Sequence, residues 1–370
     1  MDSPGTRFEN ETVSALVGAR LDLLNSAWTH DLSAQITDAN RQTDAPTGFP
    51  SSTESDRFEA SFVTVYDSGG TDHSLTFAAD YELEGFNNVL TFDDRNEAEN
   101  IGFVGQYRYA GDDFDVSASL RHDINDLFED ATTFRVGAGF RVTDTTRLRA
   151  SLGTGVKNPT LSALFGFFDG VFVGDPDLQP EKSTGWEVGL DQTLAARRLT
   201  VSLTYFNAEL EYEIFSVFDP VTFVSSPDNR TTKSAQQGVE LAGSADLGSG
   251  FTFNGAYSFL EAEENGAEGI RRPNHLASAV LDWTAKDKKA SANLAVRYNG
   301  EALDDNFATF PATVETLEAY TLVNFNVRVK LIDGIYLFGR IENLLDEQYE
   351  QVFSFVSPGV NGLVGFEARF

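Results

Sequence analysis

Residues 360–370 read V-N-G-L-V-G-F-E-A-R-F, and they are the most informative segment of the chain about its fold. Every second residue in it is apolar or small: Gly362, Val364, Phe366, Ala368 and Phe370. The positions between them include two charged residues, Glu367 and Arg369. Because side chains alternate across a strand, this pattern predicts a β-strand with one apolar and one polar face. Such strands, ending on an aromatic residue, are typical of outer-membrane β-barrels, in which one face meets lipid and the other the lumen.

The same alternation recurs along the chain. Apolar positions alternate with polar or small ones in segments 114–121, 134–142, 147–152, 199–205, 251–259, 290–299 and 323–330. Each segment has the length of a strand. We count about 17 strands. Because single-chain bacterial barrels have an even number, either one strand is miscounted or N-terminal strands are missing, and the order of short and long connections favours at least one missing N-terminal strand.

The connections between these strands alternate in length. Short turns fall at 67–72, 110–113, 143–146, 195–198, 247–250, 285–289 and 332–334. Long polar connections fall near 40–57, 85–97, 156–181, 209–234, 261–272, 300–319 and 346–361. Short turns on one side and long loops on the other favour an outer-membrane barrel over a soluble sandwich.

The composition excludes several other classes of protein. No apolar run is long enough for a transmembrane helix, and 31 Phe, 11 Tyr and 31 Gly favour β-structure. Without cysteine, the chain has no disulfide, thiolate metal site or cysteine nucleophile. The net charge of -30 disfavours nucleic acid and points either to cationic or metal-bearing partners or simply to the solubility of long loops. The N-terminus lacks the features of a signal peptide, so we expect the export signal upstream.

Four ordered motifs, between residues 153 and 349, resemble one family. Residues 174–190, G-D-P-D-L-Q-P-E-K-S-T-G-W-E-V-G-L, resemble the N-P-x-L-x-P-E-x-S-x-x-x-E-x-G signature of TonB-dependent receptors, with Asp175 in place of the usual Asn. Residues 153–166, G-T-G-V-K-N-P-T-L-S-A-L-F-G, resemble the segment that enters a long outer loop, and 237–240, Q-G-V-E, resemble a strand start. Residues 340–349, R-I-E-N-L-L-D-E-Q-Y, resemble x-x-N-L-F-D-x-x-Y, with Leu345 in place of Phe.

The resemblance implies an all-β, antiparallel transmembrane β-barrel in the outer membrane of a Gram-negative bacterium. In this family an N-terminal plug fills a barrel of about 22 strands and carries the segment that contacts TonB. We therefore expect residues 1–370 to form an N-terminally incomplete barrel without its plug. The expected partners are outer-membrane lipid, the barrel-assembly machinery and, in the complete receptor, TonB and a metal-chelate or cobalamin-like ligand.

The implied function is energy-dependent uptake of a scarce ligand, such as a ferric siderophore or cobalamin, by a receptor in truncated form. A passive porin and a non-transporting remnant are the alternatives. No enzyme and no cofactor are expected, because His30, His73, His122 and His275 lie neither at metal-ligand spacing nor beside a serine in a nucleophile motif. Acidic clusters occur in the loops but lack EF-hand spacing, so the sequence alone does not decide whether they bind Ca²⁺.

Two sets of residues are candidates for specific roles. An apolar tract at 161–173 interrupts a polar connection, and exposed aromatic residues are costly unless they pack or bind a ligand. The candidates for ligand contact are Phe165, Phe167, Phe168 and Phe172, with self-packing over the barrel mouth as the alternative. Phe366 and Phe370 are the predicted barrel-assembly signal.

Overall fold

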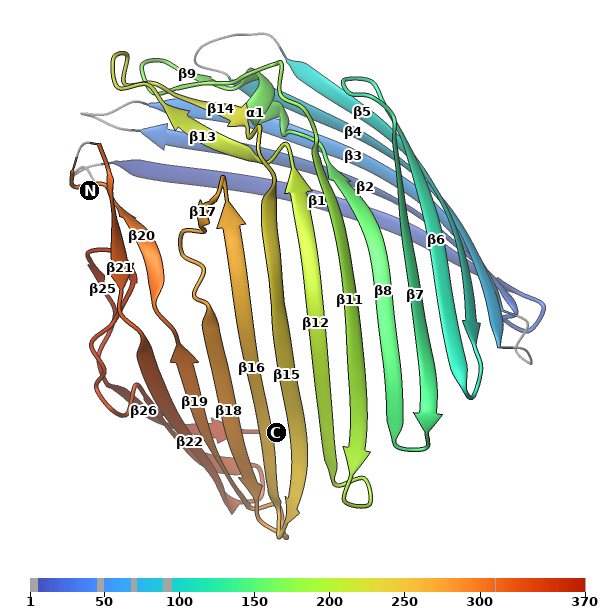
Figure 1. Cartoon of the computed structure of the whole chain (residues 1–370), viewed down its shortest axis with the longest axis vertical. Coiled ribbons are helices and arrows are strands. Elements are labelled where there is room, and N and C mark those ends of the chain that lie inside the picture. Colours follow the sequence, from blue (N-terminus) through green and yellow to red (C-terminus); the bar gives the residue numbers. More distant parts are fainter. Residues whose placement is uncertain (1–5, 45–49, 68–71, 89–94, 310, 370) are drawn as a thin grey trace. The chain divides into compact units, whose positions relative to one another are not determined.

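Figure 1 shows a computed structural model of the protein, which describes residues 6–44, 50–67, 72–88, 95–309 and 311–369. These residues are almost entirely β-strand, and eighteen of the described strands share one sheet. The all-β, antiparallel prediction is therefore confirmed. Within the described ranges, no helix is long and apolar enough to cross a membrane.

The chain divides into two compact units, which we describe separately. Unit 1 contains Met1–Ala138, Ser151–Gly185 and Glu209–Lys233. Unit 2 contains Gly139–Ala150, Trp186–Ala208 and Ser234–Phe370. Four strands contribute residues to both units: β7 (Ala131–Thr143), β8 (Thr146–Lys157), β11 (Glu181–Leu194) and β12 (Leu199–Glu211).

Unit 1 begins with six strands that lie side by side in sequence order (Figure 1). They are β1 (Arg7–Leu23), β2 (Trp28–Asp44), β3 (Ser51–Asp67), β4 (His73–Asn88), β5 (Asn96–Ala110) and β6 (Phe114–Asn125). Each pairs antiparallel with the next. The connections between these strands are at most seven residues long, which is too short for the crossover that parallel strands need, so each strand pairs with the next one in the chain.

The two faces of these strands differ in polarity. On β4, Leu75 and Phe77 are exposed on one face, whereas Asp80 lies on the other. Asp80 accepts a hydrogen bond from Nη1 of Arg121 on β6 at 2.8 Å, and the same guanidinium pairs with Asp123 at 2.7 Å. We call these the apolar face and the polar face.

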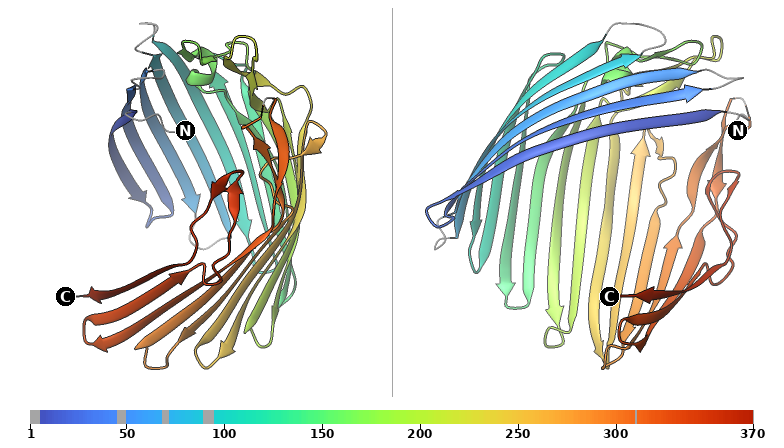
Figure 2. Two further views of the ribbon diagram at one scale, coloured as in Figure 1. Left: turned by 90° about the vertical axis from the view of Figure 1, so that its left-hand side faces the viewer. Right: turned by 180° about the vertical axis from the view of Figure 1, so that it is seen from behind.

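Unit 2 contains the C-terminal strands, which Figure 2 shows from two further sides. They are β15 (Ser234–Gly248), β16 (Phe251–Glu264), β17 (Ala267–Glu268), β18 (His275–Thr284), β19 (Ala290–Asn299), β22 (Tyr320–Ile332), β23 (Ile335–Glu342) and β26 (Asn361–Ala368). All pairings among them are antiparallel. Two hairpins lie in the connections: β20 (Ala302–Asn306) with β21 (Thr313–Leu317), and β24 (Glu350–Val352) with β25 (Phe355–Val356).

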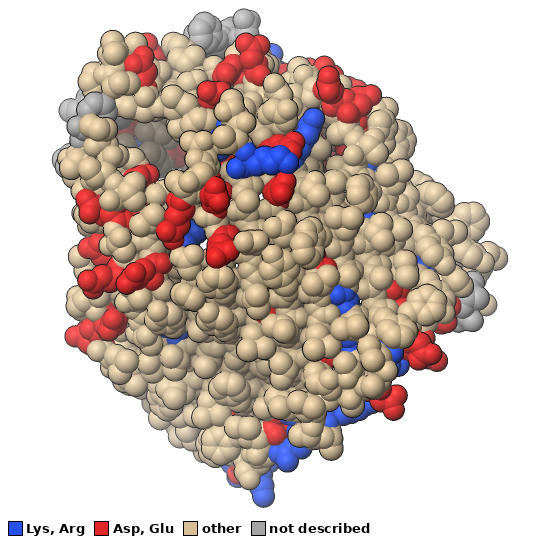
Figure 3. Space-filling view, in the orientation of Figure 1, with Lys and Arg blue, Asp and Glu red and all other residues tan. Residues whose placement is uncertain are grey.

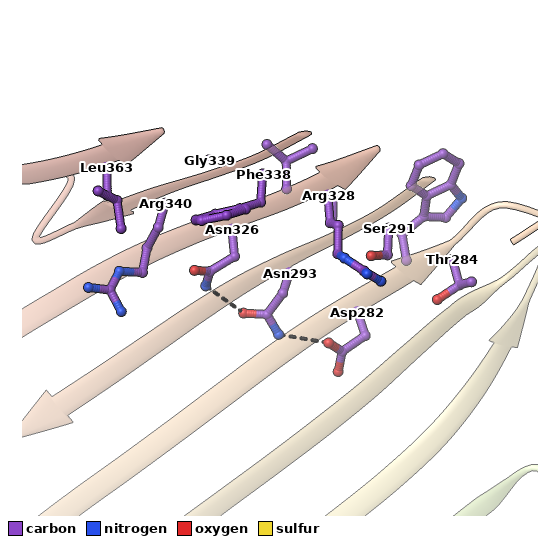
Figure 4. A pocket seen from close by; sticks show the side chains of 13 residues that line it. Asp282, Thr284, Ser291, Asn293, Asn326, Arg328, Phe338, Gly339, Arg340 and Leu363 are labelled. Atoms are coloured by element: carbon purple, nitrogen blue, oxygen red, sulfur yellow. Dashed lines mark hydrogen bonds between the residues drawn. The ribbon is translucent and has the colours of Figure 1, made fainter. Parts of the chain in front are cut away.

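The polar face of unit 2 carries a chain of amide hydrogen bonds (Figure 4). Asn326 donates to Asn293 at 3.4 Å, and Asn293 donates to the carboxylate of Asp282 at 2.7 Å. Nearby, Arg328 pairs with Glu367 at 2.9 Å and lies 3.7 Å from the centre of the Tyr336 ring. Together with neighbouring residues, Asp282, Asn293, Asn326 and Arg328 line a cavity of about 360 Å³.

The strand count agrees with the sequence-based count, because seventeen of the described strands have eight or more residues. Strand β11 begins at Glu181, directly after Pro180, and β2 and β3 extend further into the predicted 40–57 connection than expected. Strand β26 confirms the predicted last strand. Phe366 lies within it and is 72% exposed, whereas Phe370 lies outside the described residues.

Candidate functional site

Two long connections of unit 1, residues 158–180 and 212–233, pack together, and we call them the two-loop cap. The first contains α1 (Leu161–Phe165), β9 (Phe167–Phe168) and β10 (Phe172–Val173). The second contains β13 (Ile214–Phe218) and β14 (Ser225–Asn229). Strand β14 pairs antiparallel with β13 and parallel with β10, which pairs with β9. The two connections therefore share one four-stranded sheet.

The short helix anchors the cap to the strands below it. Thr160 caps α1, because its hydroxyl accepts the backbone N–H of Ala163 at 3.1 Å. The helix buries Leu161 and Leu164 against Phe86 of β4. Phe86 lies on the same face of β4 as Asp80, which is the polar face. Burying each leucine contributes about 1.5–3 kcal/mol to the packing of the helix against β4.

The D-P-D-L-Q-P-E motif at 175–181 supplies further anchors. Leu178 is buried in the same apolar cluster as Leu164. The carboxylate of Glu181 is also buried; it pairs with Nζ of Lys157 at 2.9 Å and accepts the N–H of Ile214 at 2.8 Å. Glu181 therefore joins the end of β8 and the start of β11 to the first strand of the second loop.

The side chain of Asn229 holds the two loops together. Its oxygen accepts the N–H of Gln179 at 2.7 Å, and its amide nitrogen donates to the carbonyl of Gln179 at 3.0 Å. The same nitrogen donates to the carbonyl of Tyr212 at 2.7 Å. The Asn229 side chain thus makes the two hydrogen bonds to the backbone of Gln179 that the backbone of a neighbouring strand would otherwise make.

The four predicted ligand-loop residues all lie in the first loop of the cap. Phe165 packs partly buried against the apolar cluster, and Phe167, Phe168 and Phe172 are half-buried on β9 and β10. The ring centroids of Phe168 and Phe172 are 6.0 Å apart, and Asn88 of β4 donates to the carbonyl of Phe167. This packing favours the self-packing alternative, and ligand contact by these residues stays a prediction.

The most exposed apolar residues of the cap lie in the second loop, where we predicted only a polar connection. We call Val217, Phe218, Val221 and Phe223 the aromatic tip. Val221 is 84% exposed and Phe223 is 66% exposed, and the rings of Phe218 and Phe223 are 6.1 Å apart. The signal was present in the sequence, because V-F-D-P-V-T-F places four apolar residues around a D-P turn.

Asp219 builds the turn that displays this tip. Its carboxylate accepts the N–H of Val221 at 2.8 Å and the hydroxyl of Thr222 at 2.7 Å. The hydroxyl of Thr222 and the N–H of Val221 hold the pKa of Asp219 below its ordinary value. Phe223 has a φ of 61°, a left-handed conformation that costs a bulky residue about 1–3 kcal/mol. The turn thus stabilises an exposed aromatic ring in an unfavourable backbone conformation.

Carboxylates dominate the charge of the cap. It contains six acidic residues and two basic ones, Arg230 and Lys233. Arg230 pairs with Glu213 at 3.0 Å, and Lys233 pairs with Glu209 at 2.9 Å and Glu211 at 2.8 Å. Hydrogen bonds from Lys233 to these last two glutamates raise the pKa of the lysine. Figure 3 shows one face of the loop region, where acidic side chains outnumber basic ones.

A second anchoring point lies in unit 2. Asp304 of β20 is fully buried; it accepts Nε of Arg271 at 2.6 Å and the N–H groups of Phe353 at 2.7 Å and Asp305 at 2.9 Å. Burial alone would raise the pKa of Asp304, but the N–H of Phe353 and the Arg271 guanidinium outweigh burial and lower it. Asp304 thus ties three connections together.

The residues of the last motif serve a local turn. Asn343 accepts the N–H of Glu347 and donates to its carbonyl, both at 2.9 Å. Asp346 accepts the N–H of Val360 at 2.9 Å. These hydrogen bonds hold the connection before β26 together.

The histidines lie among aromatic and hydroxyl groups. His73 hydrogen-bonds to the hydroxyl of Tyr107 at 2.7 Å, His275 to that of Tyr257 at 2.8 Å and His122 to Thr132 at 2.9 Å. The ring of His30 lies 6.0 Å from that of Phe62. In the parts of the chain that the structure describes, no group of three or more His, Asp or Glu side chains could hold a metal ion.

Known proteins similar to this chain include a vitamin B12 transporter, BtuB, of Photobacterium profundum, which is 27% identical over 262 residues. That alignment covers 69% of this chain and 40% of the transporter. Two solved structures share the fold: the FrpB iron transporter of Neisseria meningitidis (TM-score 0.78, 12% identity) and the siderophore receptor PirA of Acinetobacter baumannii (TM-score 0.79, 16% identity). Each is matched over 98% of this chain, which spans 63% and 62% of their respective lengths.

The family model for the β-barrel of TonB-dependent receptor-like proteins matches residues 2–344. The match covers nearly the whole chain, including the part upstream of residue 146, where the sequence showed alternation but no motif. It agrees with the antiparallel strands, the alternating faces and the anchored long connections described above. This chain therefore belongs to the TonB-dependent receptor β-barrel family.

Proposed function

We propose that this chain is the barrel portion of an outer-membrane receptor that takes up a scarce ligand, such as a ferric siderophore or cobalamin, with energy supplied through TonB. The family match over residues 2–344 carries this proposal. The similarity to a vitamin B12 transporter and the fold shared with iron and siderophore receptors support the two ligand classes.

In this proposal the apolar face meets outer-membrane lipid of a Gram-negative bacterium, and the polar face lines the lumen. Residues 1–370 supply barrel strands, and TonB binds a segment outside them. The two-loop cap lies on the ligand side, where Phe165, Phe167, Phe168 and Phe172 are candidate contacts. Phe366 and Phe370 direct assembly by the barrel-assembly machinery.

Uptake in a bacterial strain without its own siderophore and cobalamin receptors tests this function. The gene is expressed with an export signal and with the segment that binds TonB in this proposal, and accumulation of ⁵⁵Fe-labelled chelates and labelled cobalamin is measured with and without functional TonB. We expect accumulation of one of these ligands that is lost without TonB. Accumulation that does not depend on TonB would replace the proposal with a passive porin, and no accumulation would favour a non-transporting remnant.

A further inference from the structure

The two-loop cap combines an exposed apolar surface with an acidic surround. Val221 and Phe223 are exposed in the turn at Asp219. Val173 on β10 and Val171, which directly precedes that strand, are also exposed. The N–H of Ser225 on β14 donates to the carbonyl of Val171 at 2.8 Å, so the strand that follows the aromatic tip begins beside Val171. Exposed apolar groups gathered in this way are typical of a binding surface.

The cap offers no uncommitted cation to a negatively charged ligand. Its first loop contains no Lys, Arg or His at all. In its second loop, Arg230 is held by Glu213 and lies 4.6 Å from the centre of the Phe215 ring, and Lys233 is held by two glutamates.

The two lysines that flank the cap, Lys157 and Lys182, also lie next to other groups of the protein. Lys157 pairs with the buried carboxylate of Glu181. Lys182 lies 5.8 Å from the centre of the Tyr212 ring and lines the same cavity as the carboxylates of Glu209 and Glu211. In contrast, Asp169 stands exposed in the turn between β9 and β10, next to the apolar surface.

We propose that the two-loop cap recognises a neutral or cationic ligand with a largely apolar surface and discriminates against polyanionic chelates. This inference rests on the proposed function and narrows its ligand class. Stacking on the aromatic tip supplies the contact area. The carboxylates around the tip repel an anion, and because they are exposed, the repulsion weakens as salt is added.

Equilibrium binding to the purified, folded chain in detergent micelles tests the inference without transport. The probes are a neutral and a cationic ferric trihydroxamate, neutral cyanocobalamin and a trianionic ferric tris-catecholate. We expect the best of the uncharged or cationic probes to bind at least about 10-fold more tightly than the trianion at low salt, with a smaller ratio at 1 M salt, because the Debye length falls to about 3 Å.

Three variants connect the binding to the cap. Phe223→Ala should weaken binding of the preferred probe by about 3- to 10-fold, the range expected for loss of one aromatic contact. Phe307→Ala removes a phenylalanine that is 75% exposed on a different connection and should leave binding unchanged. Asp169→Lys adds a free cation and should tighten binding of the trianion while leaving that of the neutral probes unchanged.

The outcomes separate this inference from the proposed function. If the trianion binds as tightly as the other probes, or if Phe223→Ala and Phe307→Ala behave alike, the inference is wrong, whereas TonB-dependent uptake can still hold. If no probe binds, the inference also fails, and the uptake experiment alone decides the function. If a neutral or cationic probe binds tightly but is not taken up in a TonB-dependent way, the inference about recognition holds and the proposed transport function is wrong.

Discussion

Replacing Leu164 with alanine should release the whole two-loop cap from the strands beneath it. Leu164 is 3% exposed and packs with Leu161, Leu178 and Phe86. Removing such a buried leucine side chain costs about 2–5 kcal/mol, because the cluster loses contacts and keeps a cavity. The strand ladders stay intact, so this cost should appear as easier local opening of the cap.

Amide hydrogen exchange followed by mass spectrometry, on the folded chain in a lipid nanodisc, measures this opening. At the lower bound of about 2 kcal/mol, protection of amides in 159–180 should fall about 30-fold. Because Asn229 and Glu181 join the two loops, protection in 213–229 should fall with it. Leu345→Ala is the control, since Leu345 is 60% exposed and its truncation should cost less than about 0.5 kcal/mol.

Two results would refute this reasoning. If exchange rises in the first loop alone, the side-chain bonds of Asn229 do not couple the loops, and the cap is two independent elements. If exchange rises in neither, the cluster around Leu164 does not anchor the cap. Asn229→Ala provides a second measurement, because it should loosen 213–229 and leave the apolar cluster packed.

Three further predictions concern the sheet and its loops. A cysteine at Leu203, on the apolar face of β12, should react with membrane-soluble reagents, and one at Thr200 with aqueous reagents; equal aqueous labelling would contradict a lipid-facing apolar side. Deleting Phe370 from an exported chain should reduce the heat-modifiable folded form on a gel, and unchanged folding would remove its role in assembly. Asp304→Ala should raise hydrogen exchange in 300–306 and 350–356, with a cost of about 1–3 kcal/mol for the donors left unpaired. Because folding lowers the pKa of Asp304, the stability that its carboxylate contributes is fully present above the ordinary Asp pKa of about 3.9 and is lost as the pH falls through the folded value. Acid should therefore raise hydrogen exchange in the same segments of the wild type but not in Asp304→Ala.

Most of the sheet could be predicted from the sequence because strand alternation is a local property. The segments around Phe134 and Val327 became β7 and β22, and the turn at 143–146 joins β7 to β8, since each pattern depends only on neighbouring residues. The two bonds between Asn343 and Glu347 are local in the same way, because these residues are four positions apart in one turn.

The cap could not be predicted, because its contacts join residues far apart in the sequence. Leu164 meets Phe86, and Asn229 meets Gln179, and neither partner is marked by spacing. The phenylalanines that looked exposed in the sequence, Phe165 among them, are partly buried by these contacts. The exposed ring of Phe223 lies in the 209–234 connection, which we predicted only as a polar connection.

The turn at Asp219 has a practical consequence for protein engineering. Residues 217–223 take their shape from one carboxylate and its own neighbours, whereas Leu164, Glu181 and Asn229 secure the cap from positions outside this segment. Exposed loop tips of this kind tolerate insertions well. A foreign peptide inserted in place of residues 220–222 should therefore be exposed while the rest of the cap keeps its structure. This tip is thus a suitable insertion site for an epitope or an affinity tag.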